Sequence, residues 1–329
     1  LQTQEEIDMV EEVARTYGYD NIPYTFPGGG GVVGRTTAVD KIESLCRDIL
    51  SRAGLYEVFT LTMASQESFE KMPFAVKDWL SVKNPLVEEQ RIVRGSLLYH
   101  LVEAASRNFR VKNFDVKIFE IARVYFSAEG FLEERLILST ALSGETVDFY
   151  YAKGVMETFF AELGIKYKFV PSEYSYFHPG QSAKILVNNE ECGCLGRLNP
   201  FSAEKLDIER EIFLSEIYLD KIIPLIPRKV YSSIPKFPSV ERDIAMIISD
   251  EIPGSDIDEA IKNAGPEFLV QIECFDVYKG EQIPPGKKSM AYSLTFQSME
   301  RTLTDEEINI ARENICSVME SKFGAKIRE

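Results

Sequence analysis

The chain has 329 residues, of which 45% are hydrophobic and 27% charged, and its formal net charge is −15. This length predicts two or three domains with cores of their own, and the composition excludes an intrinsically disordered chain. The acidity argues against indiscriminate nucleic-acid binding, because contacts with phosphate need a cationic surface.

Two features concern the cellular setting. No apolar run approaches the roughly eighteen residues that a membrane-spanning helix needs, and the amino terminus has no signal-peptide pattern. We therefore expect a cytoplasmic protein without membrane contact. The five cysteines are an odd number without the spacing of a disulfide framework. The chain begins without methionine, close to the middle of a predicted helix, so we expect a fragment of a longer protein.

The amino-terminal segment is predicted to form an amphipathic helix that ends at a Tyr-Gly-Tyr-Asp-Asn-Ile-Pro run. Ile7 and Val10 lie on its apolar face, and three acids crowd another face: Asp8, Glu11 and Glu12. On the residues alone, three acids on an exposed helix are solvated charges.

A glycine-rich stretch follows from Gly29 to Thr36, with the spacing of a phosphate-binding loop that has arginine in place of lysine. Such a loop needs a buried strand before its first glycine, and the preceding Tyr-Thr-Phe-Pro run is not one. Arg35 also cannot replace the compact lysine ammonium at the phosphates. We therefore interpret residues 27–35 as a linker without a nucleotide site.

Residues 36–228 are predicted to form an α+β domain built on an antiparallel sheet. Runs of strands at hairpin spacing with helices packed on them are typical of this class. The periodicity predicts helices at about 39–50, from Gln66, at 96–110 and at 151–163. It predicts strands at 57–63, 79–83, 116–126, 135–143, 183–188, 191–198 and 212–218.

Side chains suited to catalysis or metal binding are sparse in this domain. The chain has only two histidines, His100 in a predicted helix and His178 before a proline, so a nucleophile, base and orienter triad has little to work with. Cys192 and Cys194 could form one corner of a zinc site, but no second pair supplies further ligands. We interpret them as alternating residues of a strand and predict no catalytic residue.

The last third of the chain predicts a β-α-β-β-α-β unit, which is a ferredoxin-like fold. Strands are expected at 242–249, 269–278, 288–297 and 325–329, and helices at 255–264 and 305–323. Thr304 and Glu307 are the predicted capping box of the last helix, and Gly324 its end. Because both helices must cover the apolar face of the sheet, the other face stays open to a ligand.

Four blocks of this region carry a family resemblance: residues 237–243 (FPSVERD), 275–278 (FDVY), 287–294 (KKSMAYSL) and 301–307 (RTLTDEE). They closely resemble the ferredoxin-fold anticodon-binding domain that ends the bacterial phenylalanyl-tRNA synthetase β subunit. The resemblance implies tRNA binding by residues 236–329, after a linker at 229–235. Without it, the local cations would be a solvated rim. With it, the candidate contacts are Arg242, Lys279, Lys287, Lys288 and Arg301.

Residues 1–26 are similar to the tail of the B5 domain of the same subunit, where the phrase D-x-x-E-E-V-A-R-x-Y-G-Y-D-N-I-P is characteristic. In that family these acids line a Mg²⁺ site shared with the α subunit, and carboxylate oxygens suit this ion. The motif assigns Asp8, Glu11 and Glu12 as ligands. Gln2 stands about where the family has a further aspartate.

Residues 84–86 (NPL), 94–98 (RGSLL), 119–125 (FEIARVY) and 178–183 (HPGQSA) resemble the B6-B7 core of that subunit. The resemblance implies a class II synthetase-like sheet that is inactive. A class II site needs an arginine on the ATP α-phosphate, and Glu120 stands in its place, so charge on a transferring phosphoryl group is not offset. By analogy with class II dimers, we expect the helix at 96–110 to face the partner.

These resemblances imply a non-catalytic β-subunit fragment of phenylalanine–tRNA ligase in an (αβ)2 assembly. The α subunit would join phenylalanine to tRNA with ATP and Mg²⁺, while this chain supplies an interface and an RNA-holding arm. Two alternatives are a free-standing ATP-using ligase, which would exchange pyrophosphate alone, and a protein-binding scaffold without RNA contact.

Overall fold

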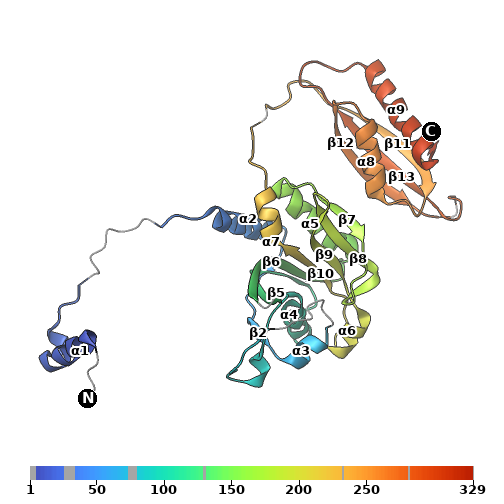
Figure 1. Cartoon of the computed structure of the whole chain (residues 1–329). Helices are drawn as coiled ribbons and strands as arrows, with labels where there is room; N and C mark the ends of the chain where they lie inside the picture. Colours follow the sequence, from blue (N-terminus) through green and yellow to red (C-terminus); the bar gives the residue numbers. More distant parts are fainter. Residues whose placement is uncertain are drawn as a thin grey trace.

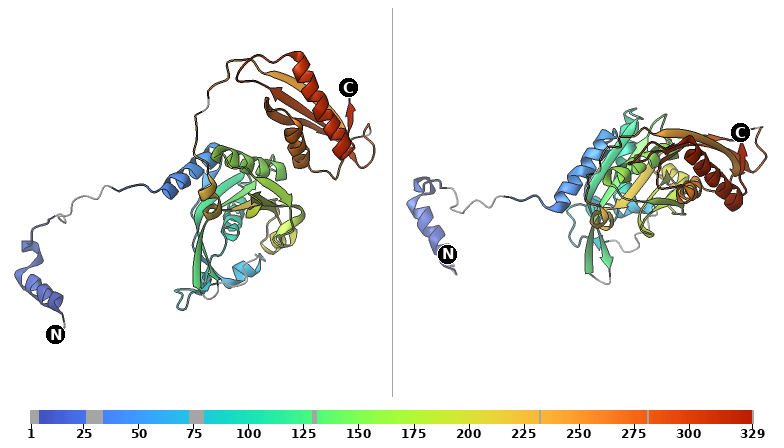
Figure 2. Two further views of the ribbon diagram at one scale, coloured as in Figure 1. Left: turned by 45° about the horizontal axis from the view of Figure 1, so that its top comes forward. Right: turned by 90° about the horizontal axis from the view of Figure 1, so that it is seen from above.

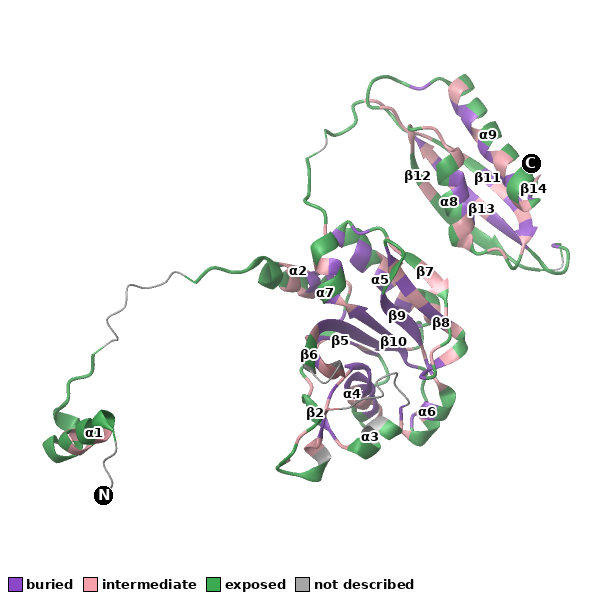
Figure 3. Cartoon of the chain, in the orientation of Figure 1, coloured by how far each residue is buried: buried purple, intermediate pink, exposed green. Residues whose placement is uncertain are grey.

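We describe the fold from a computed structural model, which covers residues 5–25, 34–72, 80–128, 131–231, 233–280 and 282–328. Helix α1 (Glu6–Tyr17) and the 3-10 turn η1 (Tyr19–Asn21) come first and contribute no buried residue (Figures 1 and 3). The glycine-rich run at 29–33, the residue Trp79 and the last residue Glu329 lie outside the described residues, and so do the predictions made for them.

A mixed sheet forms the centre of the chain. Its order is β1-β5-β6-β10-β9-β8-β7, and every neighbouring pair is antiparallel except β1 and β5, which are parallel. The prediction of an α+β chain with antiparallel sheets is thereby confirmed, with this one exception. The strands are β1 (Tyr56–Glu57), β5 (Val116–Ala128), β6 (Phe131–Ser143), β7 (Lys168–Pro171), β8 (Phe177–Val187), β9 (Glu190–Leu198) and β10 (Phe213–Tyr218).

Helices cover both faces of this sheet (Figure 2). On one face α2 (Ala38–Arg52) and α5 (Phe149–Leu163) bury a core with the inward residues of the strands. On the other face α4 (Leu98–Arg110) buries a second core, joined by α6 (Pro200–Lys205). Short elements complete the unit: β2 (Met63–Ala64), β3 (Leu80–Ser81), β4 (Ile92–Val93), α3 (Gln66–Glu70), α7 (Leu219–Ile222), η2 (Glu88–Gln90) and η3 (Ile223–Leu225).

The strand predicted at 57–63 is wrong as one element, because it divides into β1 and β2. Between them the backbone N–H of Thr60 donates to the carboxylate of Glu120 at 3.2 Å instead of pairing in a ladder. The guanidinium of Arg94 binds the same carboxylate at 3.0 Å and also donates to Thr60 Oγ1 at 2.9 Å. A buried ion pair therefore replaces strand pairing at this edge.

The carboxy-terminal unit has the predicted ferredoxin fold. Its four strands are all antiparallel to their neighbours in the order β12-β13-β11-β14, and α8 and α9 pack together on one face. The elements are β11 (Val240–Ser249), α8 (Gly254–Ala264), β12 (Leu269–Tyr278), β13 (Lys287–Phe296), α9 (Asp305–Phe323) and β14 (Lys326–Arg328). The edge strand β12 has two irregularities, at Val270 and at Phe275, where its register against β13 shifts.

Local signals at the ends of α9 are as predicted. The backbone N–H of Glu307 donates to the hydroxyl of Thr304 at 3.4 Å, and the Glu307 carboxylate accepts from the Thr304 N–H at 3.0 Å. Gly324 ends the helix in the left-handed region with φ of 60°. Between the two units, Lys168 Nζ lies 3.7 Å from Asp256 Oδ1 and 3.6 Å from Glu259 Oε2.

A carboxylate is buried beneath α4 in the central unit. Glu216 of β10 accepts hydrogen bonds from Ser96 Oγ at 2.7 Å, Leu97 N at 3.1 Å and Ser139 Oγ at 3.1 Å. Burial raises its pKa above the ordinary value, although these three donors act in the opposite direction. In the pH range above the ordinary pKa the folded chain thus holds a proton that the unfolded chain has lost, so stability falls as pH rises.

We predict that Glu216→Gln flattens this pH dependence. Relative to the variant, the native chain should lose unfolding free energy as the pH rises through and above the ordinary titration range of a glutamate carboxyl. Urea unfolding at several pH values measures the difference. Glu190→Gln, at an exposed carboxylate of the neighbouring strand β9, is the control. Parallel pH profiles for the native chain and Glu216→Gln would contradict the assignment.

Candidate nucleic-acid interface

The face of the ferredoxin sheet opposite α8 and α9 is a platform of small side chains. Directly paired residues of antiparallel strands point to the same side of the sheet, so the strand register defines the rows of this face. Ala245 pairs with Ala291, and Ile247 pairs with Ser289, at its centre. On its central strand β13 the side chains are short, those of Ser289, Ala291, Ser293 and Thr295, which leaves room for a ligand that lies across the strand.

The two ends of this platform carry opposite charges. Toward the start of β11 the rows contain Glu241, Asp243 and Glu273. The row through Ala245 and Ala291 also holds Asp276. From that row to the end of β11 lie Tyr278, Lys287, Lys326 and Arg328, which we call the cationic end of the sheet. All four side chains are exposed. Phosphate groups are therefore attracted to the cationic end and repelled from the other.

Three of the five predicted tRNA contacts already have anionic partners within the chain. Arg242 lies on the helix-covered side, where it binds Asp305 at 2.6 Å. Lys279 lies 2.6 Å from Asp250. Arg301 binds Glu307, and this bond, with the hydrogen bonds from Thr304, lowers the pKa of the Glu307 carboxyl to about 2. The structure does not bring these three cations together on the open face.

The adjacent lysines of β13 face opposite sides of the sheet. Lys287 is exposed on the open face beside Ser249. Lys288 is buried at 9% exposure, and its ammonium donates to the backbone carbonyls of Asp250 at 3.3 Å and Ile252 at 2.6 Å. Burial lowers the pKa of Lys288. Its position is that of a structural residue which ties the β11–α8 turn to β13.

Sequence reasoning missed Tyr278, Lys326 and Arg328 as members of this face. The last strand was predicted, and alternation along it would have placed Lys326 and Arg328 on the same side of the sheet. Only the pairing of β14 with β11, however, puts these two residues beside Ile247 and Ala245. Tyr278 likewise reaches this end through its pairing with Ser289.

Two of the three acids predicted to bind Mg²⁺ make contacts within the helix that carries them. The Asp8 carboxylate accepts from the Glu5 N–H at 3.0 Å as part of the α1 cap, and Glu12 pairs with Arg15. Within the ranges that the structure describes, no group of three or more His, Cys, Asp or Glu side chains could hold a metal ion. Asp8, Glu11 and Glu12 alone therefore do not fit a metal site.

The position where a nucleotide-binding arginine was sought is part of a buried ion pair. Glu120 binds Arg94, and the side chains are 2% and 6% exposed. Arg94 also donates to the backbone carbonyl of Arg123 at 3.2 Å. A guanidinium held in this way is not available for a phosphate.

The histidines and cysteines have structural surroundings. His100 is buried in α4 with its ring edge-to-face against Tyr99, and burial lowers its pKa. His178 Nδ1 accepts from the Gly180 N–H at 3.1 Å. Cys192 and Cys194 lie buried on β9, as the strand interpretation predicts, and burial raises the pKa of both thiols.

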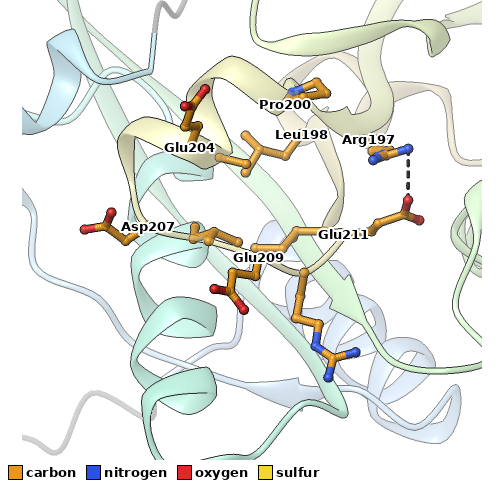
Figure 4. A pocket seen from close by; sticks show the side chains of 11 residues that line it. Arg197, Leu198, Pro200, Glu204, Asp207, Glu209 and Glu211 are labelled. Carbon is orange, nitrogen blue, oxygen red and sulfur yellow. Dashed lines mark ion pairs between the residues drawn. The ribbon is translucent and has the colours of Figure 1, made fainter.

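A hollow of about 450 Å³ lies beside α6, between the end of β9 and the start of β10 (Figure 4). Arg197 and Glu211 form an ion pair at 2.9 Å on its wall. Three further carboxylates line it, those of Glu204, Asp207 and Glu209, against one more guanidinium, that of Arg210. This excess of negative charge opposes a nucleotide or an RNA backbone.

Comparison with known families agrees with this geometry. Residues 235–328 match the family described as ferredoxin-fold anticodon binding domain, which defines the class of the carboxy-terminal unit. Residues 22–219 match the family described as phenylalanyl tRNA synthetase beta chain CLM domain. The chain therefore belongs to the phenylalanyl-tRNA synthetase β-chain family.

Curated relatives match almost the full length of this chain. Phenylalanine–tRNA ligase beta subunits of Clostridium tetani and Halalkalibacterium halodurans are each 36% identical to this chain over 98% of its length. The chain spans 42% of the length of these relatives. A solved pyrrolysyl tRNA synthetase of Desulfitobacterium hafniense has a TM-score of 0.49 at 16% identity, over 60% of this chain and 73% of that chain. Among the described residues no helix is long and apolar enough to span a membrane.

The opposite orientations of the two lysines predict separable effects. Lys288→Ala should lower the unfolding free energy by about 1 to 3 kcal/mol, because two carbonyls of the β11–α8 turn lose their donor. Lys287→Ala, at an exposed position without such bonds, should stay within about 0.5 kcal/mol of the native chain. Thermal or urea unfolding measures both. Equal stabilities of the two variants would refute the structural role of Lys288.

Proposed function

We propose that this chain is a non-catalytic, tRNA-binding and subunit-contacting part of a phenylalanine–tRNA ligase. The observation that carries the proposal is the ferredoxin sheet with one open face, cationic at one end, in a chain of the β-subunit family. Aminoacylation of tRNA with phenylalanine would take place on an α subunit in an (αβ)2 assembly in the cytoplasm.

The chemistry of the open face supports RNA as its ligand. Lys287, Lys326 and Arg328 offer charge to phosphates, and the exposed ring of Tyr278 offers a surface on which a base can stack. We keep Lys287 as a direct contact from the predicted set. For Arg242, Lys279 and Arg301, a contact with RNA would compete with the ion pairs that they already make.

The central unit supports a role without chemistry of its own. We assign it to the class II synthetase-like core of the family. The position that corresponds to the ATP-binding arginine is occupied by Glu120, which pairs with Arg94. Helix α4 covers the sheet face with Leu98, Leu101 and Val102. ATP and Mg²⁺ then belong to the α subunit, and Asp8, Glu11 and Glu12 would contribute to a magnesium site only together with residues from outside this chain.

The surface that meets the α subunit is better placed at the β1 edge than on α4. The predicted helix at 96–110 packs on the chain's own sheet, so most of its side chains are buried. Along the edge segment after β1, Phe59 is 82% exposed and Leu61 is also exposed. Apolar side chains lying together at a sheet edge favour a protein partner.

We expect Phe59→Asp combined with Leu61→Asp to abolish co-purification with the α subunit, because two carboxylates would be buried without partners. Ile310→Asp, at an exposed apolar position on α9, is the matched control and should leave the complex intact. Size-exclusion chromatography of the co-expressed subunits gives the result. A stable complex with the double variant would place the interface elsewhere.

The tRNA contact has its own prediction. Lys287→Gln with Arg328→Gln should weaken binding of phenylalanine-specific tRNA by roughly tenfold and make the salt dependence shallower by about 1.5 in log–log slope. Arg301→Gln is the control, since Arg301 is already paired with Glu307. Filter binding across a range of salt concentrations measures both quantities. An unchanged slope in the double variant, or absence of tRNA binding by the native chain, would support a protein-binding scaffold instead.

A further inference from the structure

The segment that joins the two sheet-based units has a composition unlike the rest of this acidic chain. Asp220 and Glu241 are consecutive acids, with no other acid between them, in a chain that has 52 in all. Four basic residues lie in the same interval: Lys221, Arg228, Lys229 and Lys236. We call residues 227–231 and 233–237 the basic tether.

Residues 227–231 and 233–236 of the basic tether are exposed, and Phe237 is half-buried (Figure 3). Its larger side chains stand in solvent, with Val230 at 85%, Tyr231 at 86% and Ile234 at 83% exposure. An aromatic and two aliphatic side chains with so little cover contribute nothing to either core. Solvation alone does not account for them, because a linker needs only polar or flexible residues.

The charges of the basic tether are unpaired within the part of the chain that the structure describes. No ion pair or hydrogen bond involves the side chain of Arg228, Lys229 or Lys236 there. By contrast, Arg242, Lys279 and Arg301, a short way along the chain, each hold a carboxylate. Three cations of the ferredoxin unit are thus neutralised by carboxylates of the chain, whereas the cations of the basic tether are not.

Both ends of the basic tether are fixed to folded parts. Ile226, just before it, packs against the core of the central unit, and the carbonyl of Phe237 accepts from Gln297 Nε2 at 2.8 Å. The three cations are therefore presented between two anchored points (Figure 1). Anchoring limits the conformational entropy that a bound ligand must remove.

The tether and the cationic end of the sheet lie at opposite ends of strand β11. The tether leads into β11 at Val240, whereas Lys287 is paired with Ser249 at the far end of that strand. Ten residues of β-strand span roughly 30 Å. A ligand that meets both sets of cations must be large and polyanionic, and it must pass the acidic end of the platform at a distance.

We infer that the basic tether is a second RNA-contacting element. Arg228, Lys229 and Lys236 bind the tRNA backbone, and the ring of Tyr231 stacks on an unpaired base or against a ribose. This inference rests on the proposed tRNA-binding function and adds a site outside the ferredoxin sheet. Because the tether cations have no competing carboxylates, each contact with phosphate is made without first breaking an ion pair.

The experiment compares the full 329-residue chain with the triple variant Arg228→Gln, Lys229→Gln and Lys236→Gln. Fluorescence anisotropy with phenylalanine-specific tRNA gives affinity and its salt dependence. The triple variant should bind at least about tenfold more weakly at low salt, with a log–log salt slope shallower by about 2 to 3. The control variant, with the same change in charge, replaces three other exposed lysines by Gln: Lys83, Lys205 and Lys262.

The outcomes separate the tether from the proposed function. If the native chain binds tRNA and the triple variant matches the control in affinity and slope, the tether inference is overturned and the function stands. If the native chain does not bind tRNA, the proposed function falls and the inference falls with it. Tyr231→Ala should weaken binding by about fivefold or more while Tyr231→Phe keeps it, and equal affinities for these two variants would remove the stacking role.

Discussion

The buried ion pair between Arg94 and Glu120 sets the form of the central unit. It joins strand β5, the edge segment around Thr60 and the chain that leads into α4, at donor–acceptor distances of 3.0 Å between the charged groups and 2.6 Å from Thr60 to the carboxylate. Loss of one partner from such a pair costs about 3 to 5 kcal/mol, because the remaining charge stays buried. The same pair holds the guanidinium of Arg94 against Glu120, so this cation is not available for a phosphate.

Charge pairing also decides which surface can meet RNA. In this chain of net charge −15, cations such as Arg242, Lys279 and Arg301 find a carboxylate nearby, and a paired cation adds little to the attraction of phosphate. The unpaired cations that we assign to RNA binding lie in two places, at one end of the open sheet and in the segment before β11. Because the chain is acidic as a whole, we expect contacts with a polyanion only where such cations gather.

Much of the ferredoxin unit could be predicted from the sequence, because its strands alternate cleanly and α9 carries its own start and stop signals. The bounds of α9 and β12 agree with the prediction. The short elements β4, β7, α6 and α7 were missed, since segments of two to six residues have too little periodicity and depend on tertiary partners. The site was harder to predict, because the Arg242–Asp305 pair joins residues 63 positions apart. The opposite orientations of Lys287 and Lys288 were predictable, since Lys288 alternates in step with the apolar Met290 and Tyr292.

The two irregularities of β12 have a consequence for the chain at high concentration. This strand is the outer member of its sheet, with one side of its backbone free to accept a strand from another molecule, and Val270 and Phe275 add exposed apolar surface. Each bulge interrupts the even spacing of N–H and C=O groups that a foreign strand would need. Glu273 and Asp276 add like-charge repulsion between two such edges. The two irregularities of β12 therefore disfavour amyloid-like self-association, and an edge strand without them would be prone to aggregate.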